Sequence, residues 1–243
     1  SCPRSITALS FILLGILGKY EENLQELKNH LKELKDVLEE RSDELSRIRK
    51  EYSKQLEEKI IQGLKDLNFL DVNFAIDFQQ KKNYTDNGTD DIQYLISTNP
   101  GESLKPLGQI VSGGELSRIM LALKAILADR DQIETLIFDE IDTGISGRTA
   151  QKVSEKMAVI GQHHQVLCIT HLPQIAAMAD SHFEIEKHLQ GTETITQIHV
   201  LEEDDSIREL ARLLGGAEIT SAVFENAKEM KELAQKQKNT RFK

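Results

Sequence analysis

Two short segments of this chain combine glycines, a hydroxyl and carboxylates in an order that suits phosphate chemistry. The first is Val111-Ser112-Gly113-Gly114-Glu115-Leu116-Ser117-Arg118, a glycine-containing turn that opens an apolar helix. The second is Thr135-Leu136-Ile137-Phe138-Asp139-Glu140, an apolar run that ends in two carboxylates. A helix start offers free N–H groups and the positive end of the helix dipole to a phosphate group. An acidic pair after a strand suits Mg²⁺ and an attacking water molecule.

The segment from Ser112 to Glu115 also satisfies a purely structural pattern. A serine followed three residues later by a glutamate is a capping box, in which the two side chains bond each other's backbone N–H groups. Two consecutive glycines are costly if only a cap is needed, because glycine loses the most conformational entropy on folding. We therefore interpret the pair as backbone that a ligand approaches closely. The residues expected to contact a nucleotide here are Ser112, Gly113, Gly114 and Glu115.

Asp139 and Glu140 follow a continuous apolar run, as expected of a strand covered on both faces. In open α/β sheets, ligands bind at the carboxyl ends of such strands. Because neighbouring strand residues point to opposite sides, the two carboxylates should have separate roles. We assign Asp139 to Mg²⁺, directly or through water, and Glu140 to the base that orients the hydrolytic water. Two solvated acids are the alternative, but the glycine-rich loop 142–147 follows at once.

His171 ends the next apolar strand, predicted at residues 166–170. If this strand runs parallel to the one before Asp139, both residues emerge at the same edge of the sheet. An imidazole there can hydrogen-bond a γ-phosphate or the attacking water. The phosphate cradle G-x-x-x-x-G-K-[ST] does not occur in the 243 residues, so we expect half of a nucleotide site to come from elsewhere.

The elements that must position these residues alternate between strand and helix patterns. After a polar turn at 81–90, the pattern indicates an α/β layer structure with parallel strands at its centre. Strands are predicted at 72–78, 92–98, 135–138, 166–170, 182–187 and 194–201. Helices are predicted at 113–128, 149–160 and 172–179, with two terminal helices that start near Ser206 and Ile219.

Residues 21–67 are predicted to form one long coiled-coil helix. Apolar residues recur there at alternating spacings of three and four, and the spacing changes to four and four after Tyr52, which is a stutter. One strand of a coiled coil cannot bury its own seam, so a partner helix is expected. The seam consists of Leu24, Leu27, Leu31, Leu34, Leu38, Leu45, Ile48 and Tyr52.

The composition is that of a charged globular chain, with 39% hydrophobic residues and a net charge of -10. This acidity argues against nucleic acid covering most of the surface, although a local basic patch stays open. Two cysteines cannot build a disulfide framework, which favours a reducing, cytoplasmic setting.

Four regions are expected along the chain. Residues 1–18 form an apolar leader, shorter than the roughly 18 residues that a membrane span needs, and not necessarily native to the mature fold. The alternative for this leader is a helix that packs on another element. Residues 19–68 form the coiled-coil arm helix, residues 69–230 a head lobe, and residues 231–243 a basic tail.

The order of these motifs resembles the C-terminal lobe of an ABC/SMC-type P-loop ATPase head, over residues 92–227. Val111 to Arg118 resembles the ABC signature, Thr135 to Glu140 the Walker B strand, Asp142 to Gly147 the D-loop, and Ile169 to His171 the switch histidine. Within that superfamily the chain is most similar to the RecN family of SMC-like DNA repair proteins. The similarity is most specific at Ser97 to Glu102 and at His171 to Ala176.

The resemblance implies ATP and Mg²⁺ as cofactors and ATP hydrolysis by the complete head during DNA double-strand-break repair and recombination. Ser112 and Gly114 would contact the γ-phosphate held by an opposing head, and Asp142 would lie in the D-loop beside the nucleotide. Asp139, Glu140 and His171 would serve the site in their own head. This chain alone, without a Walker A cradle, is predicted to be inactive.

The implied partners are the N-terminal half of the same ATPase, with its Walker A lobe and outgoing arm helix, and a second head in a homodimer. DNA would be engaged through the full assembly, in the cytoplasm and at the nucleoid during repair, with no membrane involved.

Two other function classes stay open. One is the nucleotide-binding subunit of another ABC ATPase, such as a transporter, although the heptad arm and the Glu115-Leu116-Ser117-Arg118 continuation count against it. The other is a non-catalytic module in which coil and lobe only bind partners. The basic tail is a further candidate for DNA contact, but a solvated helix end is the preferred interpretation. Its cations are Lys228, Lys231, Lys236, Lys238, Arg241 and Lys243.

Overall fold

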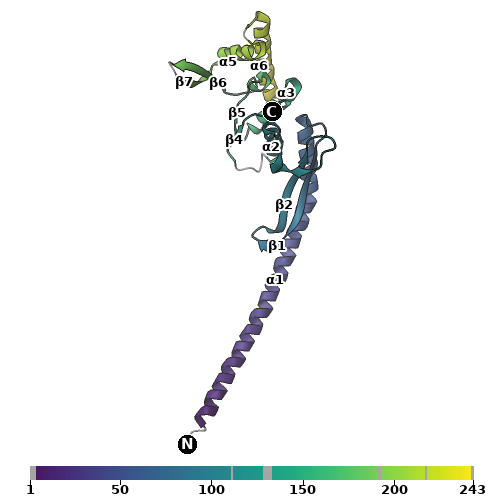
Figure 1. Ribbon diagram of the computed structural model, residues 1–243, viewed down its shortest axis with the longest axis vertical. Coiled ribbons are helices and arrows are strands. Elements are labelled where there is room, and N and C mark those ends of the chain that lie inside the picture. The colour runs from purple at the N-terminus through teal and green to yellow at the C-terminus, as the bar shows by residue number, and fades with distance from the viewer. Residues whose placement is uncertain (1–3, 111, 128–132, 191–192, 217, 242–243) are drawn as a thin grey trace. The chain divides into compact units, whose positions relative to one another are not determined.

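The computed structural model describes residues 4–110, 112–127, 133–190, 193–216 and 218–241. The chain divides into two compact units, one formed by residues up to 55 together with 77–93, the other by residues 56–76 together with those from 94 onward. Helix α1 (Arg4–Asp66) and strands β1 (Asn73–Thr85) and β2 (Gly88–Ser97) each contribute residues to both units (Figure 1).

Helix α1 confirms the predicted long helix and extends it toward the N-terminus. Its backbone is helical from Arg4, so no break at residue 18 separates a leader from the arm. Apart from half-buried Leu45, the side chains of the predicted seam are exposed, with Leu27 at 66% and Leu34 at 54%. No helix among the described residues is long and apolar enough to cross a membrane.

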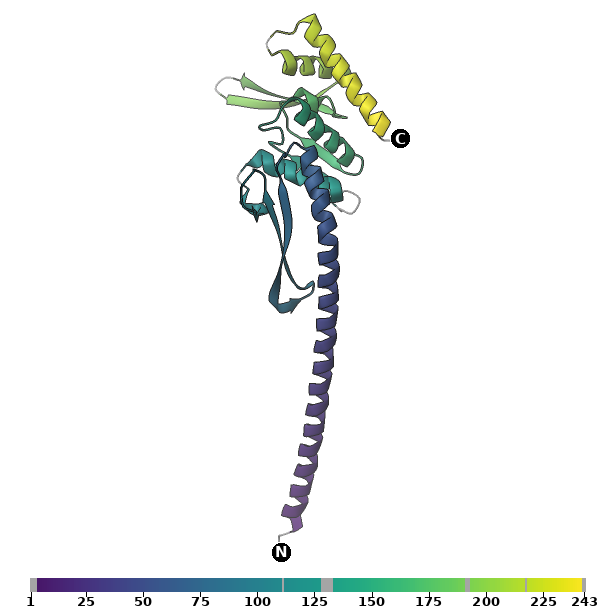
Figure 2. The ribbon, with the colours of Figure 1, turned by 90° about the vertical axis from the view of Figure 1, so that its right-hand side faces the viewer.

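In the first unit, the tip of the β1–β2 hairpin lies alongside α1 (Figure 2). Ser46 Oγ donates to Asp90 Oδ1 at 2.7 Å, and Arg49 Nη1 donates to Asp90 Oδ2 at 2.9 Å. Arg49 Nη1 also donates to the Asn87 carbonyl at 2.8 Å. Burial opposes ionisation of Asp90, but the hydrogen bonds from Arg49 and Ser46 outweigh it and lower the pKa of this carboxyl below its ordinary value.

The predicted polar turn at 81–90 is wrong, because most of it belongs to the two strands and only residues 86–87 separate them. Polar side chains are tolerated there since the hairpin is held to the helix by charged and hydroxyl groups rather than by an apolar face. A two-residue strand, β3 (Lys105–Pro106), pairs antiparallel with the far end of β2, with Ile96 opposite Lys105.

The second unit contains the parallel strand pair that the sequence predicts. β4 (Thr135–Phe138) and β5 (Gln165–Cys168) pair in parallel, with Thr135 opposite Gln165 and Phe138 opposite Cys168. Helices α2 (Gly113–Leu127), α3 (Gly147–Ile160) and the short α4 (Pro173–Ala176) belong to the same unit, after a 3-10 turn at Leu107–Gln109. The larger core comprises Ile60 and Leu64 from α1, Ile119 and Leu121 from α2, Phe138, Val153 and Ile160, among others.

The β4–β5 sheet is covered on one face only, so the prediction of strands buried on both faces is wrong for this structure. Leu136, Phe138 and Val166 join the core. On the opposite face Ile137 is 69% exposed, Leu167 45% and Ile169 56%. Alternation along each strand places these three side chains together, and the sheet ends at two strands within the described part of the chain.

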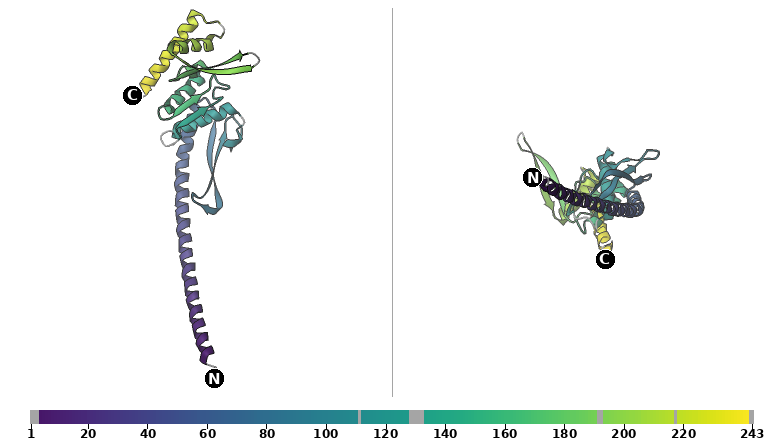
Figure 3. Two further views of the ribbon diagram at one scale, coloured as in Figure 1. Left: turned by 90° about the vertical axis from the view of Figure 1, so that its left-hand side faces the viewer. Right: turned by 90° about the horizontal axis from the view of Figure 1, so that it is seen from below.

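The last elements form an antiparallel ribbon and a helix pair. β6 (His182–Gln190) and β7 (Glu193–Leu201) pair only with each other among the described strands, and the ribbon projects freely in Figure 3. α5 (Glu203–Gly215) and α6 (Ser221–Arg241) pack together over α4. Their separate core comprises Ala176, Ala177, Met178, Ile207, Leu210, Ala211, Ala227 and Ala234.

Replacing Asp90 with asparagine should loosen the hairpin from α1. The substitution leaves the Arg49 guanidinium, 27% exposed, without its carboxylate, which we expect to cost about 1–3 kcal/mol. Hydrogen exchange in residues 77–93 should therefore become faster. Asp91→Asn is the matched control, since its carboxylate is 62% exposed and pairs with Lys81 only at 3.4 Å. Equal exchange in the two variants would contradict this role of Asp90.

Candidate functional site

The ends of β4 and β5 bring together the residues that the sequence singles out for chemistry. The Ile169 N–H donates to the Phe138 carbonyl at 3.1 Å, which continues the parallel pairing past the last strand residues. Asp139 and Glu140 follow β4 directly, and His171 follows β5 three residues after its end. The parallel pairing confirms that β4 and β5 end at the same edge of the sheet, where these three residues follow them.

Asp142 ties the two strand ends to each other. Its Oδ2 accepts hydrogen bonds from Thr170 Oγ1 at 2.6 Å and from the His171 N–H at 2.8 Å. The same oxygen lies 3.0 Å from His171 Nδ1. The Asp142 side chain is 5% exposed and that of His171 is 73% exposed. Asp142 therefore positions His171, a role that the sequence did not predict; its place beside a nucleotide, which the resemblance implies, stays a prediction.

The start of α2 shows why two glycines stand there. A Cβ on Gly114 would lie 2.9 Å from the Glu140 carbonyl oxygen and 3.0 Å from Thr143 Cβ. A Cβ on Gly113 would collide with the Glu140 carboxylate. At Gly114 the close approach is made by the backbone of the chain's own 140–143 loop, whereas at Gly113 only the end of the Glu140 side chain lies close.

The start of α2 is nevertheless accessible. Ser112 and Gly113 are exposed, Gly114 is buried, and Glu115 is half-buried. One of the two hydrogen bonds of the predicted capping box is present: the Glu115 N–H donates to Ser112 Oγ at 3.4 Å. Ser112 and Gly113 therefore remain the parts of this helix start that another molecule can reach.

Glu140 has an unusual backbone, with φ at 56°. Non-glycine residues rarely adopt this left-handed conformation. It turns the chain so that the Glu140 carboxylate lies against Gly113, where the α2 dipole favours a negative charge. Both Asp139 and Glu140 lie beyond the last residue of β4, so strand alternation does not set their directions. The Glu140 N–H donates to Asp139 Oδ1 at 2.9 Å.

Two residues of the site were missed from the sequence. Ser117 Oγ donates to the Asp139 carbonyl at 2.8 Å, and Arg118 Nη1 donates to the Thr143 carbonyl at 2.9 Å. Arg118 is 8% exposed, lies 5.5 Å from the Phe69 ring centre, and has its pKa lowered by burial. Its position four residues after Gly114, on the buried face of α2, was the available signal.

The side chains near the strand ends could supply only one or two of the ligands of a Mg²⁺ ion. Across the described residues, no group of three or more His, Cys, Asp or Glu side chains could hold a metal ion. Mg²⁺ commonly takes one or two carboxylates from a protein and fills its shell with water and phosphate oxygens. The exposed Asp139 carboxylate fits that demand.

Gly114→Ala should destabilise the chain by about 1–3 kcal/mol, because the new methyl group must push the 140–143 loop away from α2. Urea unfolding measures the change. Gly108→Ala is the matched control, since a Cβ there meets nothing within 4 Å, and it should be neutral or slightly stabilising. Equal stability of the two variants would show that the loop does not need the glycine.

Cys168 should be inert toward alkylation. Burial, with the nearby Asp142 and Asp139 carboxylates, raises the pKa of its thiol to about 12. In a Cys2→Ser background, we expect iodoacetamide to label the folded chain at least about 100-fold more slowly than the urea-unfolded chain at pH 8. A cysteine at exposed Ser221, in a chain lacking the other two, should label at an ordinary rate. Fast labelling of folded Cys168 would contradict the raised pKa of its thiol.

No protein-family profile matches the chain. Its sequence is nevertheless similar to several proteins named DNA repair protein RecN. It is 44% identical to the Halalkalibacterium halodurans protein over 193 residues, which cover 78% of this chain and 34% of the relative. It is 38% identical to the Bacillus subtilis protein over 235 residues, covering 90% of this chain and 41% of the relative. The chain thus spans about a third to two-fifths of these relatives.

Two solved Smc head domains share the fold. The head with coiled coil and joint from Pyrococcus yayanosii has a TM-score of 0.57 at 16% identity, over 85% of this chain and 37% of that one. The head from Pyrococcus furiosus, bound to the C-terminal domain of ScpA, has a TM-score of 0.52 at 18% identity, over 86% and 50%. The chain is therefore RecN-like: it is similar to part of the DNA repair protein RecN over most of its length, and it has the fold of an SMC-type head with a long helical arm.

Proposed function

We propose that this chain forms one lobe of an ATP-hydrolysing head that acts in the repair of DNA double-strand breaks and in recombination. The observation that carries the proposal is the convergence of Asp139, Glu140 and His171 at the carboxyl edge of β4 and β5. Ligands bind at this edge in open α/β sheets. The RecN relatives, which are named DNA repair proteins, support the biological setting.

Each residue at this edge has a role in the proposal. Mg²⁺ bound with ATP would stabilise charge on the phosphates, and Asp139 would hold it directly or through water. Glu140 would orient the attacking water. His171, fixed at Nδ1 by Asp142, would present its other ring nitrogen to a phosphate or to that water.

The start of α2 would face the γ-phosphate of an opposing head. Exposed Ser112 and Gly113 would make the contacts, while buried Gly114 and half-buried Glu115 would hold the helix start in place. A phosphate at this position would be favoured by the N–H groups and the dipole of α2. A homodimer of heads then places the two half-sites around each nucleotide.

Two exposed apolar surfaces support docking of the N-terminal half, which would carry the phosphate cradle. Ile137, Leu167 and Ile169 leave one face of the β4–β5 sheet uncovered, and a two-stranded sheet with an open apolar face is only marginally stable. The exposed leucines of α1 fit an outgoing arm helix. The complete protein would then act in the cytoplasm, at the nucleoid during repair.

Glu140→Gln tests the catalytic role in an assembly with the N-terminal half of the RecN-like protein. The amide cannot polarise water as a base, so we expect ATP turnover to fall at least about 100-fold while ATP binding is retained. Glu225→Gln, a substitution of an exposed glutamate on α6, should keep full turnover. Undiminished turnover in Glu140→Gln would remove this residue from the role. An assembly that forms without any ATPase activity would favour the non-catalytic interaction module.

A further inference from the structure

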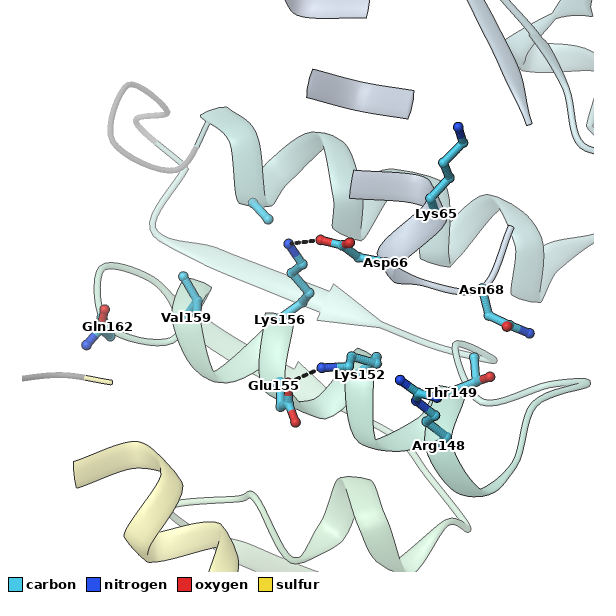
Figure 4. Close-up of a pocket in the computed structure, with 11 residues that line it drawn as sticks. Lys65, Asp66, Asn68, Arg148, Thr149, Lys152, Glu155, Lys156, Val159 and Gln162 are labelled. Carbon is cyan, nitrogen blue, oxygen red and sulfur yellow. Dashed lines mark hydrogen bonds and ion pairs between the residues drawn. The ribbon is translucent and has the colours of Figure 1, made fainter. Parts of the chain in front are cut away.

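A cleft of about 760 Å³ lies between the C-terminal end of α1 and one side of α3, within the second unit (Figure 4). None of the residues that converge at the strand ends lines it. Its charged lining consists of Lys65, Asp66, Arg148, Lys152, Glu155 and Lys156.

Three of the cations form a line along α3. Arg148, Lys152 and Lys156 recur every four residues, which places them on the same side of the helix, about 6 Å apart along its axis. Lys65, in the last turn of α1, adds a fourth cation. Such a row of regularly spaced positive charges is suited to a polyanion with repeating charges rather than to one isolated anion.

The carboxylates in the cleft leave a surplus of positive charge. Lys156 Nζ pairs with Asp66 at 3.1 Å, and Lys152 Nζ with Glu155 at 3.1 Å. Glu155 is also bound from the other side by Gln237 of α6, whose amide donates at 2.9 Å. Four cations against two carboxylates give the lining a net charge of about +2, in a chain whose net charge is -10.

Two of these cations are not used by the fold. In the described part of the chain, neither the Lys65 nor the Arg148 side chain has an ion-pair or hydrogen-bond partner. By contrast, cations of the basic tail are engaged in docking α6. Lys231 Nζ donates to the Ala179 carbonyl at 3.4 Å, and Lys238 pairs with Asp180. The cleft is therefore a better candidate for binding an external anion than the tail.

The remaining residues that line the cleft include no aromatic group that would recognise a nucleotide base by stacking. Ala125 and Val159 are its apolar members, and it contains no aromatic side chain on which a base could stack. Contacts from lysine and arginine to phosphates position a nucleic acid without reading its sequence. A ligand held here would be recognised by its backbone charge.

We propose that this cleft binds the phosphate backbone of double-stranded DNA independently of sequence, through Arg148, Lys152, Lys156 and Lys65. The choice of DNA among polyanions rests on the proposed function in DNA repair. A phosphate that reaches Lys156 must compete with Asp66, so the unpaired Arg148 and Lys65 should supply the first contacts.

Fluorescence anisotropy of the full chain with a labelled duplex of mixed sequence tests the proposal, with no nucleotide present. We expect the triple variant Arg148→Gln, Lys152→Gln, Lys156→Gln to bind at least about 10-fold more weakly at low salt. The slope of log affinity against log salt should decrease by about 0.9 for each lost phosphate contact. The control triple variant Lys82→Gln, Lys187→Gln, Arg208→Gln removes the same charge from exposed positions and should behave like the original chain.

A double variant, Lys65→Gln with Arg148→Gln, keeps both ion pairs of the cleft and so separates binding from folding. It should lose part of the affinity and of the salt slope while unfolding at the same urea concentration as the original chain. The proposal is overturned if the chain does not bind DNA, if cleft and control variants bind equally, or if polyglutamate competes as well as DNA per charge. Because no ATP is present, these failures are distinct from a failure of the Glu140→Gln experiment.

Discussion

The structure around the strand ends depends on the buried Asp142 carboxylate. Removing a carboxylate from water is costly unless hydrogen-bond donors replace the lost solvation. Here Thr170 and His171 supply those donors, all to one oxygen. The loop after β4 and the segment after β5 are thereby fixed to each other, and Arg118 fixes the same loop to α2 from the other side. Three elements distant in sequence thus share one rigid junction.

The helices and strands whose apolar residues follow a regular spacing were predicted from the sequence. The heptad leucines predicted α1, and the two apolar runs predicted β4 and β5 with their carboxyl ends together. The sequence did not predict which residues of different elements contact each other. Nothing in the pattern of Gly113 and Gly114 reveals that the neighbour is Glu140 rather than a ligand, and nothing in an Asp-Thr-Gly loop reveals that the aspartate points inward.

The apolar surfaces that stay uncovered explain where strand prediction from hydrophobicity went wrong. Ile137, Leu167 and Ile169 are apolar, as is typical of strands that are buried on both faces. In the described part of the chain, however, the face of the sheet that carries them is exposed. The exposed seam of α1 has the same property, since its leucines are spaced for a second helix. Both surfaces are the ones at which the proposed N-terminal half would dock.

The position of the Glu140 side chain bears on when the proposed head would hydrolyse ATP. Its carboxylate already lies at the positive end of α2, so it serves as a resident anion at the place proposed for the phosphate of an opposing head. An arriving phosphate must displace it. In the proposed mechanism, head engagement would free the Glu140 carboxylate to orient the attacking water, so hydrolysis would follow closure of the dimer and a single head would stay inactive.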